Sequence, residues 1–151
     1  MKYILFFAIM FWSVKVGAQP QKNVLKSFLS DIQESNWDFD SIAYEHFIKN
    51  NRDKLHNKES SDYKEMRAIY MKSLNELSQQ LRTLDIQSLK ILKYSEAPDS
   101  LQVMALNQNA AEGAYIALND NGFMHYFHFT DDKIDSWIRF KGGKAFLNYG
   151  L

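Results

Sequence analysis

A histidine and an aspartate face each other across a predicted hairpin near the end of the chain. If Asp131-Asp132 forms a two-residue turn, the flanking segments pair so that His128 lies opposite Asp135. A carboxylate beside an imidazole orients the ring and raises its pKa, which is how many general bases are prepared. No nucleophile is placed beside the pair, and an ordinary cross-strand polar pair has the same pattern. The pair is therefore a candidate acid/base site with a structural alternative.

His125 and Ser136 form a second candidate, on the opposite face of the same hairpin. A polar pair among phenylalanines is typical of a small-ligand pocket, although a buried histidine that finds a hydrogen-bond partner explains the pattern equally well. His125 and His128 are three residues apart, so on a strand they point to opposite faces and cannot share a metal ion. We expect no metal site, and the chain has no glycine-rich phosphate loop, so we expect no cofactor.

The elements that position these residues are consecutive hairpins. The hydrophobic runs between Ala114 and Tyr149 are separated by three turn signals, namely Asn119-Asp120-Asn121-Gly122, Asp131-Asp132 and Gly142-Gly143. This pattern is typical of an antiparallel meander. If Gly142-Gly143 is also a two-residue turn, Ile138 faces Leu147 and Arg139 faces Phe146.

Side chains of a strand alternate between two faces, which divides the meander into two sets. The first set is Ile116, Leu118, Phe123, His125, Phe127, Phe129, Ile134, Ser136, Ile138, Phe140 and Leu147. The second set is Met124, Tyr126, His128, Asp135, Trp137, Arg139 and Phe146. Helices on one side would leave a ligand or partner face formed by Met124, Tyr126, Trp137, Arg139 and Phe146. The alternative is that a helix covers this second face.

Upstream of the meander, helical spacing of apolar residues predicts three helices. They cover Val24 to Ser35, about Ile42 to Ile48 with Asp40 or Ser41 as the cap, and Tyr63 to Leu84 with Asp62 and Glu65 as a capping pair. Two further strands are predicted, Ile86 to Ser95 and Leu101 to Leu106. The order indicates an α+β fold with three N-terminal helices packed on one face of a curved, five- to six-stranded antiparallel sheet.

The segment from Phe127 to Ile138, with its acidic turn Asp131-Asp132 followed by Lys133-Ile134, resembles the late hairpin of NTF2-like domains, which are cystatin-like α+β cones. The resemblance covers about a fifth of the chain and implies a cone-shaped fold of the same class. It carries no functional residue over to this sequence.

Residues 1–18 have the pattern of a secretory signal peptide, with Lys2, an apolar run from Tyr3 to Val14, and a small-residue cleavage site that ends at Ala18. Residues 19–151 are then one domain. The chain has no cysteine, which excludes disulfides and a lipid-anchored lipoprotein. We therefore expect an exported protein, periplasmic or secreted, with no membrane attachment after cleavage.

The exported domain would be nearly neutral. Without Lys2 and Lys15 it keeps 16 basic and 18 acidic residues, a net charge of −2, and it has no basic run. Nucleic acid is therefore not an expected partner. We expect a non-enzymatic binding or interaction module that uses the aromatic sheet face, with a second copy, another protein or a small molecule as the partner. The alternative is an enzyme or ligand carrier that uses His125 and Ser136, or the pair of His128 and Asp135.

Overall fold

The structure is a computed structural model that describes residues 20–47, 57–103, 106, 108–141 and 144–149, with the backbone alone for 139–149. The predicted signal peptide and the turn at Gly142-Gly143 lie outside these residues, as do the side chains of Arg139 and Phe146. The fold is α+β with an antiparallel sheet, as the sequence predicts.

Three helices precede the sheet. They are α1 (Pro20–Gln33), α2 (Phe39–His46) and α4 (Ser61–Leu81). Asp38 caps α2, since its side chain accepts a hydrogen bond from the amide of Ser41. Ser60 caps α4 by accepting from the amide of Tyr63. Each cap thus lies at least two residues before the one that the sequence predicts.

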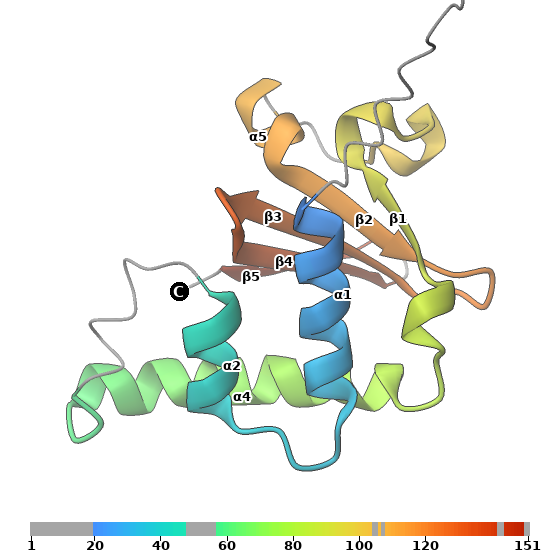
Figure 1. The fold of residues 1–151 in the computed structure, drawn as a ribbon. Coiled ribbons are helices and arrows are strands. Elements are labelled where there is room, and N and C mark those ends of the chain that lie inside the picture. Colours follow the sequence, from blue (N-terminus) through green and yellow to red (C-terminus); the bar gives the residue numbers. More distant parts are fainter. Residues whose placement is uncertain (1–19, 48–56, 104–105, 107, 142–143, 150–151) are drawn as a thin grey trace, which may run out of the picture.

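The five strands of the sheet lie side by side in chain order, which is the meander order. They are β1 (Lys90–Lys93), β2 (Ala114–Leu118), β3 (Met124–Thr130), β4 (Lys133–Lys141) and β5 (Lys144–Tyr149). Between β4 and β5 the predicted partners are confirmed, with Ile138 opposite Leu147 and Arg139 opposite Phe146. In Figure 1, α1 crosses in front of the sheet, α2 stands beside the lower part of α1, and α4 runs below the sheet behind both helices.

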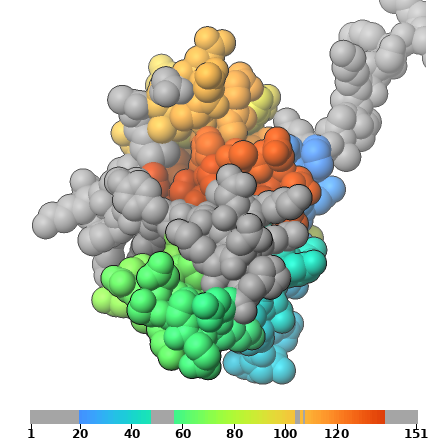
Figure 2. All heavy atoms as spheres, turned by 90° about the vertical axis from the view of Figure 1, so that its left-hand side faces the viewer, coloured from blue at the N-terminus to red at the C-terminus, as the bar shows by residue number. Residues whose placement is uncertain are grey.

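Both faces of the sheet are covered. The larger core joins α1, α2 and α4 to one face through residues such as Phe28, Phe47, Leu74, Phe127 and Trp137. The other face carries a smaller cluster of Tyr94, Ala97, Ala114, Ile116 and Tyr126. This cluster lies beneath short elements, η3 (Tyr94–Glu96), η4 (Asp99–Leu101) and α5 (Gln108–Gly113). Figure 2 shows the gold α5 region above the orange strand residues and the green start of α4 below them.

The first hairpin reverses the predicted face of its leading strand. Leu118 pairs with Met124, and the amide of Asn119 donates to the carbonyl oxygen of Phe123. The loop therefore has three residues, and Gly122 at its end has a φ of +88°, a conformation that favours glycine. A two-residue turn would place Ile116 and Leu118 with the phenylalanines, but the three-residue loop places them on the other face, so this predicted placement is wrong.

A β-bulge reverses the faces of the second hairpin in the same way. The turn at Asp131-Asp132 is confirmed, and Phe129 pairs with Ile134 beside it. The register then shifts so that His128 pairs with Ser136, which leaves Asp135 as the extra residue. The predicted register, with His128 opposite Asp135, is therefore wrong. Beyond the bulge, Trp137 pairs with Phe127 and lies on the same face as that residue.

Two local predictions between α4 and the meander are also wrong. The strand predicted from Ile86 to Ser95 is limited to β1, with 3-10 turns on either side. Leu101 closes η4, and Gln102, Val103 and Leu106 are not in a strand, while residues 104–105 lie outside the described part. The polar connection before β2 forms the helix α5.

Candidate functional site

The structure brings His128 and Asp135 together at the bulge. Nδ1 of His128 lies 2.8 Å from both carboxylate oxygens of Asp135. The same carboxylate accepts hydrogen bonds from Thr130 Oγ1 at 2.5 Å and Ser136 Oγ at 3.0 Å. Burial opposes ionisation of Asp135, but these hydrogen bonds outweigh it and lower the pKa of the carboxyl below its usual range. The ionised carboxylate therefore fixes the orientation of the imidazole.

The predicted aromatic face does not exist as one surface. Trp137 is 1% exposed and lies in the core beneath the helices, where its ring stacks on Phe47 at 5.6 Å. Tyr126 is also 1% exposed, but it lies on the other side of the sheet and donates to the carbonyl oxygen of Leu101. Met124 packs partly buried beside Tyr126. The bulge separates these side chains, so they cannot form a common partner surface.

The predicted pair of His125 and Ser136 is also separated. His125 is buried under the helices, between the rings of Phe123 and Phe127, with Nε2 3.3 Å from Oε1 of Gln80. Ser136 pairs with His128 and donates to Asp135. The structure therefore gives no pocket shared by His125 and Ser136.

A cleft that the sequence analysis did not identify lies between the end of α1 and α2. It has a volume of about 360 Å³, within the usual range of ligand sites. The described residues of its lining include four carboxylates and no lysine or arginine, namely Asp31, Glu34, Asn36, Trp37, Asp38, Ser41, Ile42, Glu45 and His46. The connection between α1 and α2 and the exposed turns of both helices provide these residues.

His46 forms the buried wall of the cleft. The residue is 3% exposed, and its Nε2 lies 2.6 Å from Oδ2 of Asp31 on α1. Its ring meets the ring of Phe28 edge-on at 5.4 Å. His46 is the last residue of α2, where a helix end favours a positively charged neighbour. This contact connects α2 with α1 and sets the spacing of the two walls.

The comparisons with protein-family models, curated proteins and solved structures give no match to this chain.

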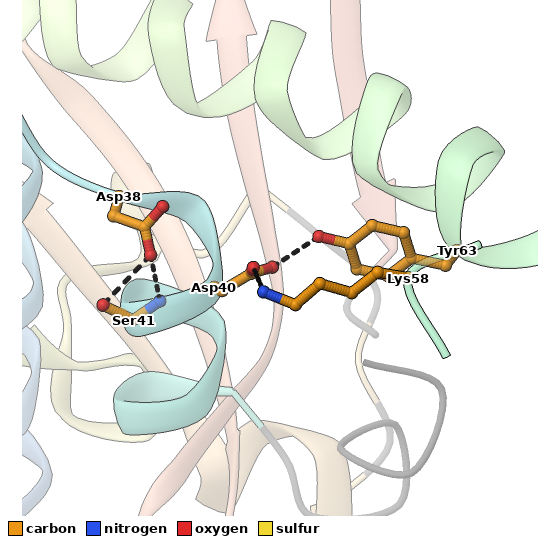
Figure 3. Close-up of polar contacts among 5 residues, drawn as sticks. All are labelled: Asp38, Asp40, Ser41, Lys58 and Tyr63. Atoms are coloured by element: carbon orange, nitrogen blue, oxygen red, sulfur yellow. Dashed lines mark hydrogen bonds and ion pairs between the residues drawn. The ribbon is translucent and has the colours of Figure 1, made fainter. Parts of the chain in front are cut away.

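The neighbouring carboxylate Asp40 points away from the cleft to α4. Figure 3 shows its oxygens directed to Lys58 and to the hydroxyl of Tyr63, which donates at 2.5 Å. Burial opposes ionisation, but the hydrogen bonds from Lys58 and Tyr63 outweigh it and lower the pKa of Asp40. Asp38 uses one oxygen, Oδ2, to accept from the amide and the hydroxyl of Ser41. Asp40 is thus neutralised locally, whereas Glu34 and Glu45 of the lining form no ion pair with another described residue.

Among the described residues, no group of three histidine, aspartate or glutamate side chains is arranged to hold a metal ion. In the same part of the chain, no helix has the length and apolar character needed to cross a membrane. The cleft could have been suspected from the sequence, because Trp37 stands between Glu34 and Asp38 in a short helix connection. Tryptophan is enriched among the residues that contribute most to binding at interfaces.

Proposed function

We propose that this protein is an exported binding module that takes a small ligand bearing an ammonium or guanidinium group into the cleft between α1 and α2. The observation that carries the proposal is the charge of the lining, which among the described residues has four carboxylates and neither lysine nor arginine. A concave site with walls of one charge concentrates ions of the opposite charge. A cation is therefore the ligand that this site would attract.

Two of the four carboxylates have no ion-pair partner in the part of the chain that the structure describes. No lysine, arginine or histidine of the described part of the chain forms an ion pair with Glu34 or Glu45. Lys133 lies near Glu45 but donates to its carbonyl oxygen, not to its carboxylate. Glu34 and Glu45 are both exposed at the cleft. They can therefore bind a ligand without first losing a partner.

Trp37 supplies the apolar part of the site. It is partly buried and packs against the larger core, so its indole is held by the fold while one part stays accessible. An indole ring is the best aromatic partner of an organic cation, and the contact contributes about 0.5–2 kcal/mol. Trp37 would therefore favour an organic cation over a simple metal ion.

Export is part of the proposal, and it is supported by the signal-peptide pattern of residues 1–18. An interaction module remains the proposed class, but its working surface moves from the sheet to the helix connection. Self-association through the sheet is not proposed, because Tyr126 and Trp137 are buried on opposite sides.

Tryptophan fluorescence tests this proposal on the chain from Gln19. That chain contains two tryptophans, Trp37 at the cleft and Trp137 in the core. Ethylammonium and ethylguanidinium should change the emission in a saturable way, and acetate at the same ionic strength should not. The double variant Glu34→Gln/Glu45→Gln should lose the response, whereas Glu65→Gln/Glu76→Gln on the exposed side of α4 should keep it. An equal response to acetate, or a response that survives the first double variant, would contradict the proposal.

A further inference from the structure

The loop between β2 and β3 contains the only asparagine of the chain that is followed by a glycine, Asn121-Gly122. A glycine has no Cβ, so it leaves its own amide nitrogen open to the side chain that precedes it. Both residues are exposed, and a Cβ atom built on Gly122 would have no atom within 4 Å. The backbone at this position is therefore surrounded by open space.

Asn119 orders the loop and leaves the groups that could react unused. Its Oδ1 accepts a hydrogen bond from the amide of Asn121 at 2.9 Å and another from the amide of Phe123 at 3.0 Å. The amide of Gly122 lies between these two donors, and in the described part of the chain it donates to no acceptor. Among the same residues, the side chain of Asn121 has no hydrogen-bond partner either. No contact of the described structure must therefore break before the two groups meet.

We propose that Asn121 is a site of spontaneous deamidation in the folded protein. The amide nitrogen of Gly122 gives its proton to hydroxide and forms a bond to Cγ of Asn121. The bond from Cγ to the side-chain nitrogen breaks, and this nitrogen takes a proton from water and leaves as ammonia. Water then opens the cyclic succinimide at either of its carbonyl groups, which gives aspartate or isoaspartate. The net reaction is hydrolysis of the side-chain amide to a carboxylate and ammonium.

The products differ from the parent in charge and in backbone length. Asp120, the neighbour of Asn121, already forms an ion pair with Lys90 of β1 at 3.1 Å, and each product adds a carboxylate beside it. Isoaspartate also adds a backbone atom to a loop whose ends are fixed by the pairing of Leu118 with Met124. Ion-exchange chromatography therefore separates both products from the parent, and peptide mass spectrometry with fragmentation locates the modified residue.

The experiment incubates the chain from Gln19 in a mildly alkaline, ammonia-free buffer and follows the ammonia released and the conversion of each asparagine. We expect Asn121 to convert at least about tenfold faster than Asn119 in the same loop and than Asn75 on the exposed side of α4. Asn121→Gln should remove the early release of ammonia, because its longer side chain closes a ring less readily. Gly122→Ala should slow it by about tenfold, because the added Cβ hinders the attacking nitrogen.

Unfolding in urea separates the effect of the fold from that of the sequence. Asn75 should convert at least about tenfold faster in the unfolded chain, because α4 fixes its backbone in the folded one. Asn121 should keep its rate within about a factor of three, since the loop leaves its reacting groups unused. Circular dichroism confirms that each variant is folded before incubation. The proposal is overturned if Asn121 of the folded chain converts no faster than Asn75, or if unfolding accelerates the two residues equally.

Discussion

Nε2 of His46 lies 2.6 Å from Oδ2 of Asp31, and this contact joins the last residue of α2 to the exposed surface of α1. The histidine side chain is 4% exposed and that of the aspartate 48%. The contact thus runs from the core to the rim of the cleft. It holds the two helices at the spacing that leaves the cleft open between them.

Removing this contact should lower stability more than removing a carboxylate that has no partner. Asp31→Ala leaves the buried Nε2 of His46 without its acceptor, and we expect a loss of about 1–2 kcal/mol in the free energy of unfolding. Glu34→Ala on the same rim should change it by less than about 0.5 kcal/mol. Urea unfolding followed by circular dichroism measures both values. Equal losses would show that the contact does not stabilise the fold.

Trp137 should behave as a core residue. The indole is 1% exposed and contacts the rings of Phe28, Phe47 and Tyr70. Trp137→Ala should therefore cost about 3–5 kcal/mol and could unfold the domain. Ile69→Ala, at a 61% exposed position of α4, is the matched control and should cost little. Thermal unfolding of the two variants compares them, and a mild effect at Trp137 would support the surface position that the sequence predicts.

Stability should fall in alkaline solution because of Tyr70. Burial raises its pKa to about 12 from the ordinary 10.0. Below pH 10 the phenol is neutral in both states, whereas between pH 10 and 12 it ionises in the unfolded chain but not in the folded one. The free energy of unfolding should therefore drop by up to roughly 2–3 kcal/mol across this range.

Tyr70→Phe should make that decrease shallower in urea titrations at pH 8 and pH 11. It should not remove the decrease, because burial also raises the pKa of Tyr63, Tyr115 and Tyr126. A variant with the same pH dependence as the parent would mean that Tyr70 titrates as an ordinary exposed phenol.

Gly113, just before β2, and Gly122, in the loop between β2 and β3, should differ in their response to alanine. At Gly113 the added Cβ would meet a backbone oxygen at 2.7 Å, so Gly113→Ala should cost about 1–3 kcal/mol through displacement of the chain. At Gly122 the space is open, and the cost of Gly122→Ala comes from the φ of +88°, about 1 kcal/mol. Gly122→Asn should be milder than Gly122→Ala because asparagine tolerates this conformation. Thermal unfolding checks the order, and equal tolerance of alanine and asparagine at Gly122 would contradict it.

The sequence predicts the fold class well because its signals are local and repeated. Leucines at helical spacing predict α4, and the turn residues at Asp131-Asp132 predict the hairpin there. The prediction of which sheet face a side chain lies on is wrong where a loop or strand contains one extra residue. The three-residue loop that ends at Gly122 and the bulge at Asp135 each shift the alternation by one position, and no side chain nearby announces either event.

The candidate sites also differ in how far the sequence predicts them. His128 and Asp135 are close in the chain, so the predicted turn places them near each other, although the bulge pairs His128 with Ser136 in the sheet. The cleft depends on the packing of α1 against α2, which joins Asp31 to His46 across 15 residues. Helical periodicity says which side of each helix is buried, but it does not say how two helices meet. Sequence alone therefore could not place this site.

The most direct test of the proposed function is a two-dimensional amide NMR titration of the chain from Gln19 with ethylammonium chloride, using sodium chloride as the control. The account predicts saturable shifts confined to residues 31–46 and the indole N–H of Trp37, and the Glu34→Gln/Glu45→Gln variant should not show them. Shifts that do not saturate, or that sodium chloride reproduces, would contradict the assignment of the cleft as a site for organic cations.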